Sequence, residues 1–222
     1  MSVPIGVIFD MDGVLVDSYW AHYASWQQMV AEHGRTMSKR QFDITFGRTS
    51  REIIAQLWPE VGDEKAILAL DRRKEWLFRQ ALATRFPPMS GAGRLLRRLF
   101  EAGIPMAIGS SAPVENVDLT LDRLRARPWM AAVVHGGHVT RGKPDPQVFL
   151  LAAMRLGVPP HRCVVVEDAP LGIEGAHRAG MAAVGMASTG RTTQMLHHAE
   201  SVVTSLDQLS PTSFRRLVDA SR

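Results

Sequence analysis

The chain has 222 residues and a mass of 24.5 kDa, enough for one large domain or for a core with a small insertion. Hydrophobic residues make up 45% of it and charged residues 22%, ordinary globular values that exclude a disordered, collagen-like or coiled-coil chain. The net charge of +4 and the sequence pI near 9.7 admit nucleic acid, anionic lipid or small phosphorylated partners, and choose none of them.

The first predicted element is a buried strand at residues 5–9, a short apolar run that Asp10 ends. This run is too short for a signal peptide or a membrane span. The single cysteine, Cys163, cannot form an internal disulfide. We therefore expect a cytoplasmic protein without a membrane partner.

Residues 18–86 show amphipathic helical patterns and no convincing strand, which indicates an all-helical insertion. We expect Ser38 and Ser50 to be N-caps within it. The predicted helices span residues 19–33, 38–46, 50–58 and 63–83.

Beyond residue 88 the chain alternates apolar runs with helical patterns, which is typical of a parallel α/β sheet. The predicted strands are 104–108, 131–135, 163–166, 182–186 and a possible last one at 201–203, and the helices are 93–102, 114–124, 146–156, 171–178 and 192–199. We expect one domain of residues 1–15 and 88–222, and a second, helical domain of residues 16–87, with hinges at 14–18 and 85–91.

Two predicted strands end in paired carboxylates. Asp10 and Asp12 follow the first strand in FDMDGVLVDS, and Glu167 and Asp168 follow a later one in CVVVEDAP. Strands of an open α/β sheet present their carboxyl ends to ligands, so the four groups are expected to converge at one edge. A hard cation of the Mg²⁺ type would relieve their repulsion, whereas the ligand spacing of a zinc site is absent. The alternative for the first pair is that Asp10 and Asp12 simply cap the following turn.

Further candidates follow two other strands. Ser110 and Ser111 come after the strand in IPMAIGSSAP, and Lys143 lies in the Gly/Pro-rich loop VTRGKPDP. Hydroxyl, backbone N–H and ammonium groups together can bind phosphate oxygens. Each is also a common cap or solvated surface group when taken alone.

In order and spacing, these four segments resemble the motifs of the haloacid dehalogenase superfamily. The helical insertion after the first motif is similar to the cap of the subfamily that includes phosphoglycolate phosphatases, sugar-phosphate phosphatases and β-phosphoglucomutases. The resemblance implies a Rossmann-like parallel-sheet core with a small all-helical cap domain, whose closure would exclude water and select the substrate.

The resemblance also implies roles. Asp10 would attack phosphorus as the nucleophile, and Asp12 would be the general acid/base. Ser110 and Lys143 would hold the transferring phosphoryl oxygens. The Mg²⁺ would be bound by Asp10, Glu167, Asp168 and the backbone carbonyl of Asp12. An aspartate at position 12 favours phosphoester chemistry, because related dehalogenases and phosphonate hydrolases lack it.

Substrate selection is expected from the insertion. His22, Trp26 and Lys74 match positions in β-phosphoglucomutase caps, and Arg51 matches less securely because its loop differs by one residue. Packing in the core of the insertion is the alternative for Trp26. The residues after Ser111 are Ala112 and Pro113, where mutases have a serine and a lysine that grip the second phosphate of a bisphosphate.

We therefore predict a monomeric Mg²⁺-dependent phosphatase of a small phosphorylated metabolite, a sugar phosphate, acting through an aspartyl-phosphate on Asp10. A β-phosphoglucomutase, which interconverts glucose 1-phosphate and glucose 6-phosphate, is the alternative within the resemblance. A basic nucleic-acid-binding protein is the alternative outside it. We expect no nucleic-acid partner, because the basic residues are scattered on predicted helices without a stacking platform.

Overall fold

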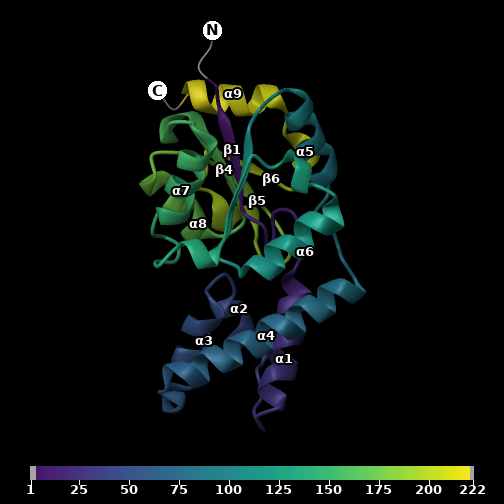
Figure 1. The fold of residues 1–222 in the computed structure, drawn as a ribbon, viewed down its shortest axis with the longest axis vertical. Coiled ribbons are helices and arrows are strands. Elements are labelled where there is room, and N and C mark those ends of the chain that lie inside the picture. The colour runs from purple at the N-terminus through teal and green to yellow at the C-terminus, as the bar shows by residue number, and fades with distance from the viewer. Residues whose placement is uncertain (1–3, 221–222) are drawn as a thin grey trace. The chain divides into compact units, whose positions relative to one another are not determined.

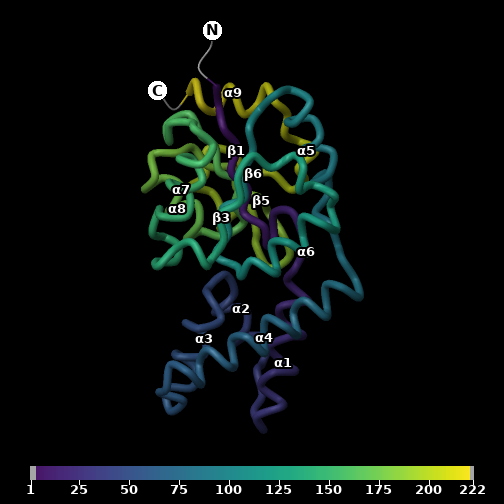
Figure 2. The backbone as a smooth tube through the Cα atoms, viewed as in Figure 1, coloured from purple at the N-terminus to yellow at the C-terminus, as the bar shows by residue number. Residues whose placement is uncertain are grey.

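The computed structural model describes residues 4–220. They form two compact units, one built from the chain up to Asp17 and from Pro88 onward, the other from Ser18–Pro87. The tube in Figure 2 shows how the first unit is assembled, because its purple N-terminal strand lies among teal, green and yellow segments from the later part of the chain. The second unit is one continuous stretch of chain.

The first unit is organised around a parallel sheet, which within the described residues has six strands in the order β3-β2-β1-β4-β5-β6. Phe9 of β1 is level with Ile108 of β2 and with Val166 of β4, so the carboxyl ends of these central strands meet at one edge. The strands are β1 (Gly6–Phe9), β2 (Met106–Gly109), β3 (Ala132–Val134), β4 (Cys163–Glu167), β5 (Ala182–Met186) and β6 (Ser201–Val203).

Helices cover both faces of the sheet. Helix α7 (Gln147–Leu156) packs on β1, β2 and β3, and α8 (Pro170–Arg178) packs on β4 and β5; both lie to the left of the strands in Figure 1, with α5 (Ala92–Glu101) and α6 (Val114–Leu124) to the right. The remaining helix, α9 (Pro211–Ala220), contacts β4.

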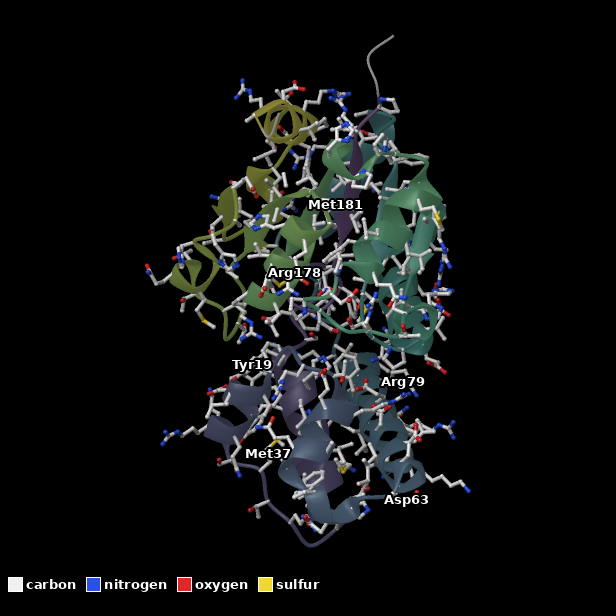
Figure 3. The ribbon with its side chains drawn as sticks, turned by 90° about the vertical axis from the view of Figure 1, so that its left-hand side faces the viewer. Tyr19, Met37, Asp63, Arg79, Arg178 and Met181 are labelled. Atoms are coloured by element: carbon white, nitrogen blue, oxygen red, sulfur yellow. The ribbon has the colours of Figure 1, made fainter. Side chains whose placement is uncertain are left out.

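The apolar composition of the strands follows from their burial. All five residues of β4, CVVVE, are buried, as expected where helices cover both faces of a parallel strand. Ile8, Phe149 and Met181, the last labelled in Figure 3, belong to a core cluster that joins strands to α7 and α8. The architecture confirms the expected Rossmann-like α/β fold class.

The second unit is helical throughout its described elements and has its own core. Its helices are α1 (Tyr19–Ala31), α2 (Lys39–Thr45), α3 (Ser50–Leu57) and α4 (Glu64–Thr84). Helices α1 and α4 pack together, and their apolar faces enclose a cluster that includes Trp26, Phe42 and Met37, which Figure 3 labels. Ser38 is the N-cap of α2, with the expected reciprocal bonds to Gln41.

Two local expectations were wrong, and one helix was not among the predicted elements. The N-cap of α3 is Thr49 rather than Ser50, because Thr49 and Glu52 form a capping box and this places Ser50 inside the helix. Residues 192–199 hold only a 3₁₀ turn, η5 (Thr193–Leu196). Helix α9 was absent from the predicted helices, although basic residues at helical spacing mark it.

Other 3₁₀ turns connect the main elements. They are η1 (Pro59–Val61), η2 (Arg127–Trp129), η3 (Gly136–His138), η4 (Pro160–Arg162) and η6 (Leu206–Gln208). Among residues 4–220, no helix combines the length and the apolar character that a bilayer span requires.

Candidate active site

The first motif forms a tight turn at the end of β1. The Asp10 N–H donates to the Val166 carbonyl of β4 at 2.9 Å, which continues the sheet pairing to the carboxylate-bearing residue. Gly13 follows with φ of +71°, a left-handed conformation that suits glycine, and its N–H donates to the Val16 carbonyl at 2.8 Å. Asp10 is buried and Asp12 half-buried beside it.

The second pair of carboxylates follows β4, next to β1. Glu167 Oε2 accepts from the Ala169 N–H at 2.7 Å, which folds this side chain back over the start of α8. Asp168 lies against the turn of the first motif, since a Cβ built on Gly13 would stand 1.8 Å from Asp168 Oδ2. A side chain at position 13 would therefore displace this carboxylate.

Lys143 joins the two motifs. Its Nζ donates to Asp10 Oδ1 at 2.8 Å and also to Glu167 Oε1, and it lies 5.1 Å from the ring centre of Phe149. The side chain is 11% exposed. A buried ammonium between two buried carboxylates offsets part of their repulsion.

The surroundings shift the ionisation of these groups. Burial raises the pKa of Asp10 to about 7, with Lys143 opposing the shift and Glu167 adding to it. Burial and the Glu167 charge also raise the pKa of Asp168, against the nearby Arg191 charge. Burial lowers the pKa of Lys143, but the charges of Asp10 and Glu167 outweigh it and leave the pKa above its ordinary value.

These carboxylates fit a hard divalent cation. Asp10, Glu167 and Asp168 each offer one ligand atom, and these atoms lie within 4.8 Å of one another. All three residues are buried, at the sheet edge where ligands of open α/β folds bind. Oxygen donors alone match the preference of Mg²⁺.

The serines lie at the end of the neighbouring strand β2. Ser110 is buried, its N–H donates to the Val134 carbonyl at 3.1 Å, and its hydroxyl accepts from the Ala112 N–H at 3.2 Å. Ser111 is half-buried in the same loop, next to Gly136. The turn thus presents a hydroxyl and backbone groups at the carboxyl edge of the sheet.

The sequence of both units agrees with a family pattern. The profile of the haloacid dehalogenase-like hydrolases matches residues 7–186. The chain belongs to this family.

Relatives within the family include several sugar-phosphate enzymes. Fructose-1-phosphate phosphatase YqaB of Escherichia coli (strain K12) is 34% identical over 81% of this chain and 94% of its own length. Hexitol phosphatase A of the same strain is 30% identical over 93% of this chain and 94% of its own length. The β-phosphoglucomutase of Bacillus subtilis (strain 168) is 33% identical over 81% of this chain and 82% of its own length. The chain is a phosphoric monoester hydrolase of the family.

Solved structures of the family share the fold. The β-phosphoglucomutase of Clostridium difficile superposes with a TM-score of 0.86 at 22% identity, covering 98% of both chains. CbbY from Rhodobacter sphaeroides, in complex with phosphate, also gives 0.86 at 22% identity, covering 96% of this chain and 100% of that one. At this identity the likeness concerns the fold.

The residues expected to bind substrate from the helical unit have different surroundings. Trp26 is 2% exposed in the hydrophobic cluster, which accords with the packing alternative, and Arg51 is exposed with its Nε donating to Asp71 Oδ2 at 2.9 Å. His22 stacks on Phe78 with ring centres 4.0 Å apart.

Lys74 is 1% exposed and lies at the centre of a buried polar group. Its Nζ contacts His22 Nδ1 at 2.7 Å and donates to Glu75 Oε1 at 2.8 Å, while the Ser50 hydroxyl donates to the same Glu75 oxygen at 2.7 Å. A lysine has donors only, so the Nδ1 that faces Lys74 is the acceptor and the ring proton lies on Nε2.

Sequence reasoning missed three residues of these clusters. Ser188 donates from its hydroxyl to Asp168 Oδ2 at 3.0 Å, and Arg191 carries its charge near the same carboxylate. Glu75 is the buried partner of Lys74. Position alone could have pointed to Ser188, because it follows β5 at the carboxyl edge of the sheet.

Proposed function

We propose that this chain is a Mg²⁺-dependent phosphatase of a sugar phosphate or similar small phosphorylated metabolite, acting through a phosphoenzyme on Asp10. The observation that carries the proposal is the buried group in which Lys143 bridges Asp10 and Glu167 while Asp168 completes a cluster of oxygen ligands. The sugar-phosphate phosphatases among the relatives support the substrate class.

In the first step, a carboxylate oxygen of Asp10 attacks phosphorus and the bond from phosphorus to the ester oxygen breaks. Asp12 gives its proton to the departing alkoxide. In the second step Asp12 takes a proton from water, the hydroxide attacks the aspartyl-phosphate, and the bond between phosphorus and Asp10 breaks. Inorganic phosphate leaves and both aspartates return to their initial states.

Lys143 supports the first step by its position. An anionic nucleophile and a phosphate dianion repel each other, and the Lys143 ammonium, 2.8 Å from Asp10 Oδ1, reduces that repulsion. Ser110 and Ser111 are proposed to bind phosphoryl oxygens from the end of β2. Asp10, Glu167 and Asp168, with the Asp12 carbonyl, would hold Mg²⁺, which when bound neutralises charge on the phosphoryl group.

Substrate selection is proposed for the helical unit of Ser18–Pro87, through His22, Arg51 and Lys74, with Trp26 supporting them by packing in the core of the unit. Arg51 is the most accessible of them and has the planar guanidinium that suits anionic groups. We also propose that the protein is a cytoplasmic monomer; size-exclusion chromatography with light scattering tests the oligomeric state.

The test is phosphate release with and without Mg²⁺ over a panel of sugar phosphates and phosphoglycolate. The proposal expects Mg²⁺-dependent release from one or a few esters. Absence of release from the whole panel, with a folded and Mg²⁺-loaded protein, would contradict it.

A β-phosphoglucomutase is the second candidate, favoured by the 33% identity to the Bacillus subtilis enzyme. Ala112 and Pro113 argue against it, since neither side chain can bind a second phosphate. β-Glucose 1-phosphate with a bisphosphate activator decides between the two. A mutase forms glucose 6-phosphate with little free phosphate, whereas a phosphatase releases phosphate.

A further inference from the structure

A short loop closed by backbone hydrogen bonds follows β5, the strand next to β4. Ser188 and Arg191 pair through their backbones, with N–H to carbonyl distances of 3.2 and 2.9 Å. Gly190 supplies the turn between them with φ of +79°, and the Ala187 N–H donates to the Val203 carbonyl at 2.8 Å. Backbone bonds on both sides therefore fix the place of Ser188.

The Ser188 hydroxyl meets one oxygen of Asp168. Its Oγ donates to Asp168 Oδ2 at 3.0 Å. The same oxygen lies close to Gly13, since a Cβ built on Gly13 would stand only 1.8 Å from it. Asp168 is 5% exposed. Its carboxylate is thus held between the turn of the first motif and the loop after β5.

The three clustered carboxylates are supported by different groups. Lys143 contacts Asp10 and Glu167, whereas the loop after β5 supplies the hydroxyl that contacts Asp168. Arg191 from that loop is buried as well. Without such a contact the Asp168 carboxylate could rotate, and cation binding would cost the entropy of that rotation.

We propose that Ser188 is a positioning residue for the divalent-cation site, holding the Asp168 carboxylate in the orientation that binds the cation. This inference rests on the proposed function, because it takes Asp10, Glu167 and Asp168 as the cation ligands. Partners that orient metal ligands raise metal affinity by roughly 10- to 100-fold.

The next residue provides a matched control. Thr189 lies in the same turn, and its hydroxyl donates to Asp17 Oδ2 at 2.8 Å rather than to Asp168. Thr189→Val removes this hydroxyl at almost constant volume. It separates loss of the contact with Asp168 from general loosening of the loop.

The experiment is calorimetric titration of Mg²⁺ into the full chain without substrate, for wild type, Ser188→Ala, Ser188→Thr and Thr189→Val. We expect Ser188→Ala to raise the Mg²⁺ Kd by about 10-fold. Ser188→Thr retains the hydroxyl and should restore affinity to within about threefold of wild type, and Thr189→Val should change the Kd by less than about twofold. Spectroscopic titration with Mn²⁺ provides a second readout.

An unchanged Kd in a folded Ser188→Ala protein overturns the proposal, and so does an equal loss in Thr189→Val. If Ser188→Ala does not fold, Ser188→Cys takes its place and should lose affinity in the same direction. Wild type that binds no Mg²⁺ also overturns it. Wild type that binds Mg²⁺ and hydrolyses no ester contradicts the proposed phosphatase instead, and the Kd values then still decide the role of Ser188.

Discussion

Asp10 is the proposed nucleophile, and its carboxylate is buried, directly follows the central strand β1 and contacts the Lys143 ammonium. An amide of the same shape keeps the packing but cannot attack phosphorus. A substitution of Asp10 by asparagine therefore tests the chemistry while the fold is kept.

Asp10→Asn should lower phosphate release by more than about 1,000-fold while the free energy of unfolding changes by about 1 kcal/mol or less. Steady-state turnover and urea unfolding measure the two quantities. Asp118→Asn, which removes a surface partner of Arg127, is the control and should retain turnover. Substantial turnover in Asp10→Asn would rule out the phosphoenzyme.

Glu75 gives the helical unit a defined response to acid. Burial raises the pKa of its carboxyl, but the Lys74 charge and the bonds from Lys74 and Ser50 outweigh burial and lower the pKa to about 2. Since the folded pKa lies below the ordinary value, the stabilisation is complete above about pH 5 and is lost as the pH falls towards 2.

Glu75→Gln should lower the free energy of unfolding by about 3 kcal/mol at pH 7, because it leaves the buried Lys74 charge without its carboxylate. The difference from wild type should shrink as the pH falls below about 5. Urea unfolding at a series of pH values measures it, with the exposed Glu64→Gln as control. A difference that does not vary with pH would contradict the assigned ionisation.

Among the helices, one start was predicted at the neighbouring residue. Ser38 was correctly expected to cap α2, but at α3 two hydroxyl residues are adjacent and Thr49 is the cap. Ser50 instead donates to Glu75, 25 residues away on α4. Sequence cannot separate the two, because either hydroxyl can bond a nearby backbone N–H and the tertiary partner is not visible in the local pattern.

Thr49→Ala should lower the free energy of unfolding by about 1 kcal/mol, the ordinary contribution of an N-cap, whether or not Glu75 is present. Ser50→Ala should cost a similar amount in wild type and much less in a Glu75→Leu background, which removes the acceptor. A double-mutant cycle from urea unfolding measures the coupling. Equal costs of Ser50→Ala in both backgrounds would show that its bond to Glu75 contributes nothing.

At the scale of the whole molecule, the fold and the cation site are linked, because the carboxylates converge only when β1 and β4 are paired. A cation that binds the folded chain must therefore stabilise it. The strength of this effect follows from the Kd and the free cation concentration.

Mg²⁺ at about 100 times its Kd should stabilise the fold by about 2.7 kcal/mol, which raises the thermal midpoint by roughly 5–10 °C for a chain of this size. Chelation with EDTA should reverse the shift. Asp168→Ala, which removes one clustered carboxylate, should show a much smaller shift, and KCl at matched ionic strength controls for screening. An equal shift in Asp168→Ala would exclude this carboxylate as a ligand.

The amino-acid sequence was sufficient to predict the alternation of strands and helices, the helical insertion after the first strand, the α/β fold class and membership of the family. These properties follow from hydrophobic periodicity and from motifs that are local in the chain. The fold brings the four strand-end motifs to one edge as expected, while the catalytic and binding roles of their residues stay predictions.

The contacts between side chains could be identified only in the folded chain. Lys143 contacts Asp10 across 133 positions of the chain, Ser188 contacts Asp168 across 20, and Lys74 contacts His22 across 52. Such contacts depend on strand order, register and side-chain rotamers, none of which leaves a periodic pattern in the sequence. For that reason the motifs could be predicted from the chain, whereas the groups that orient and neutralise them could not.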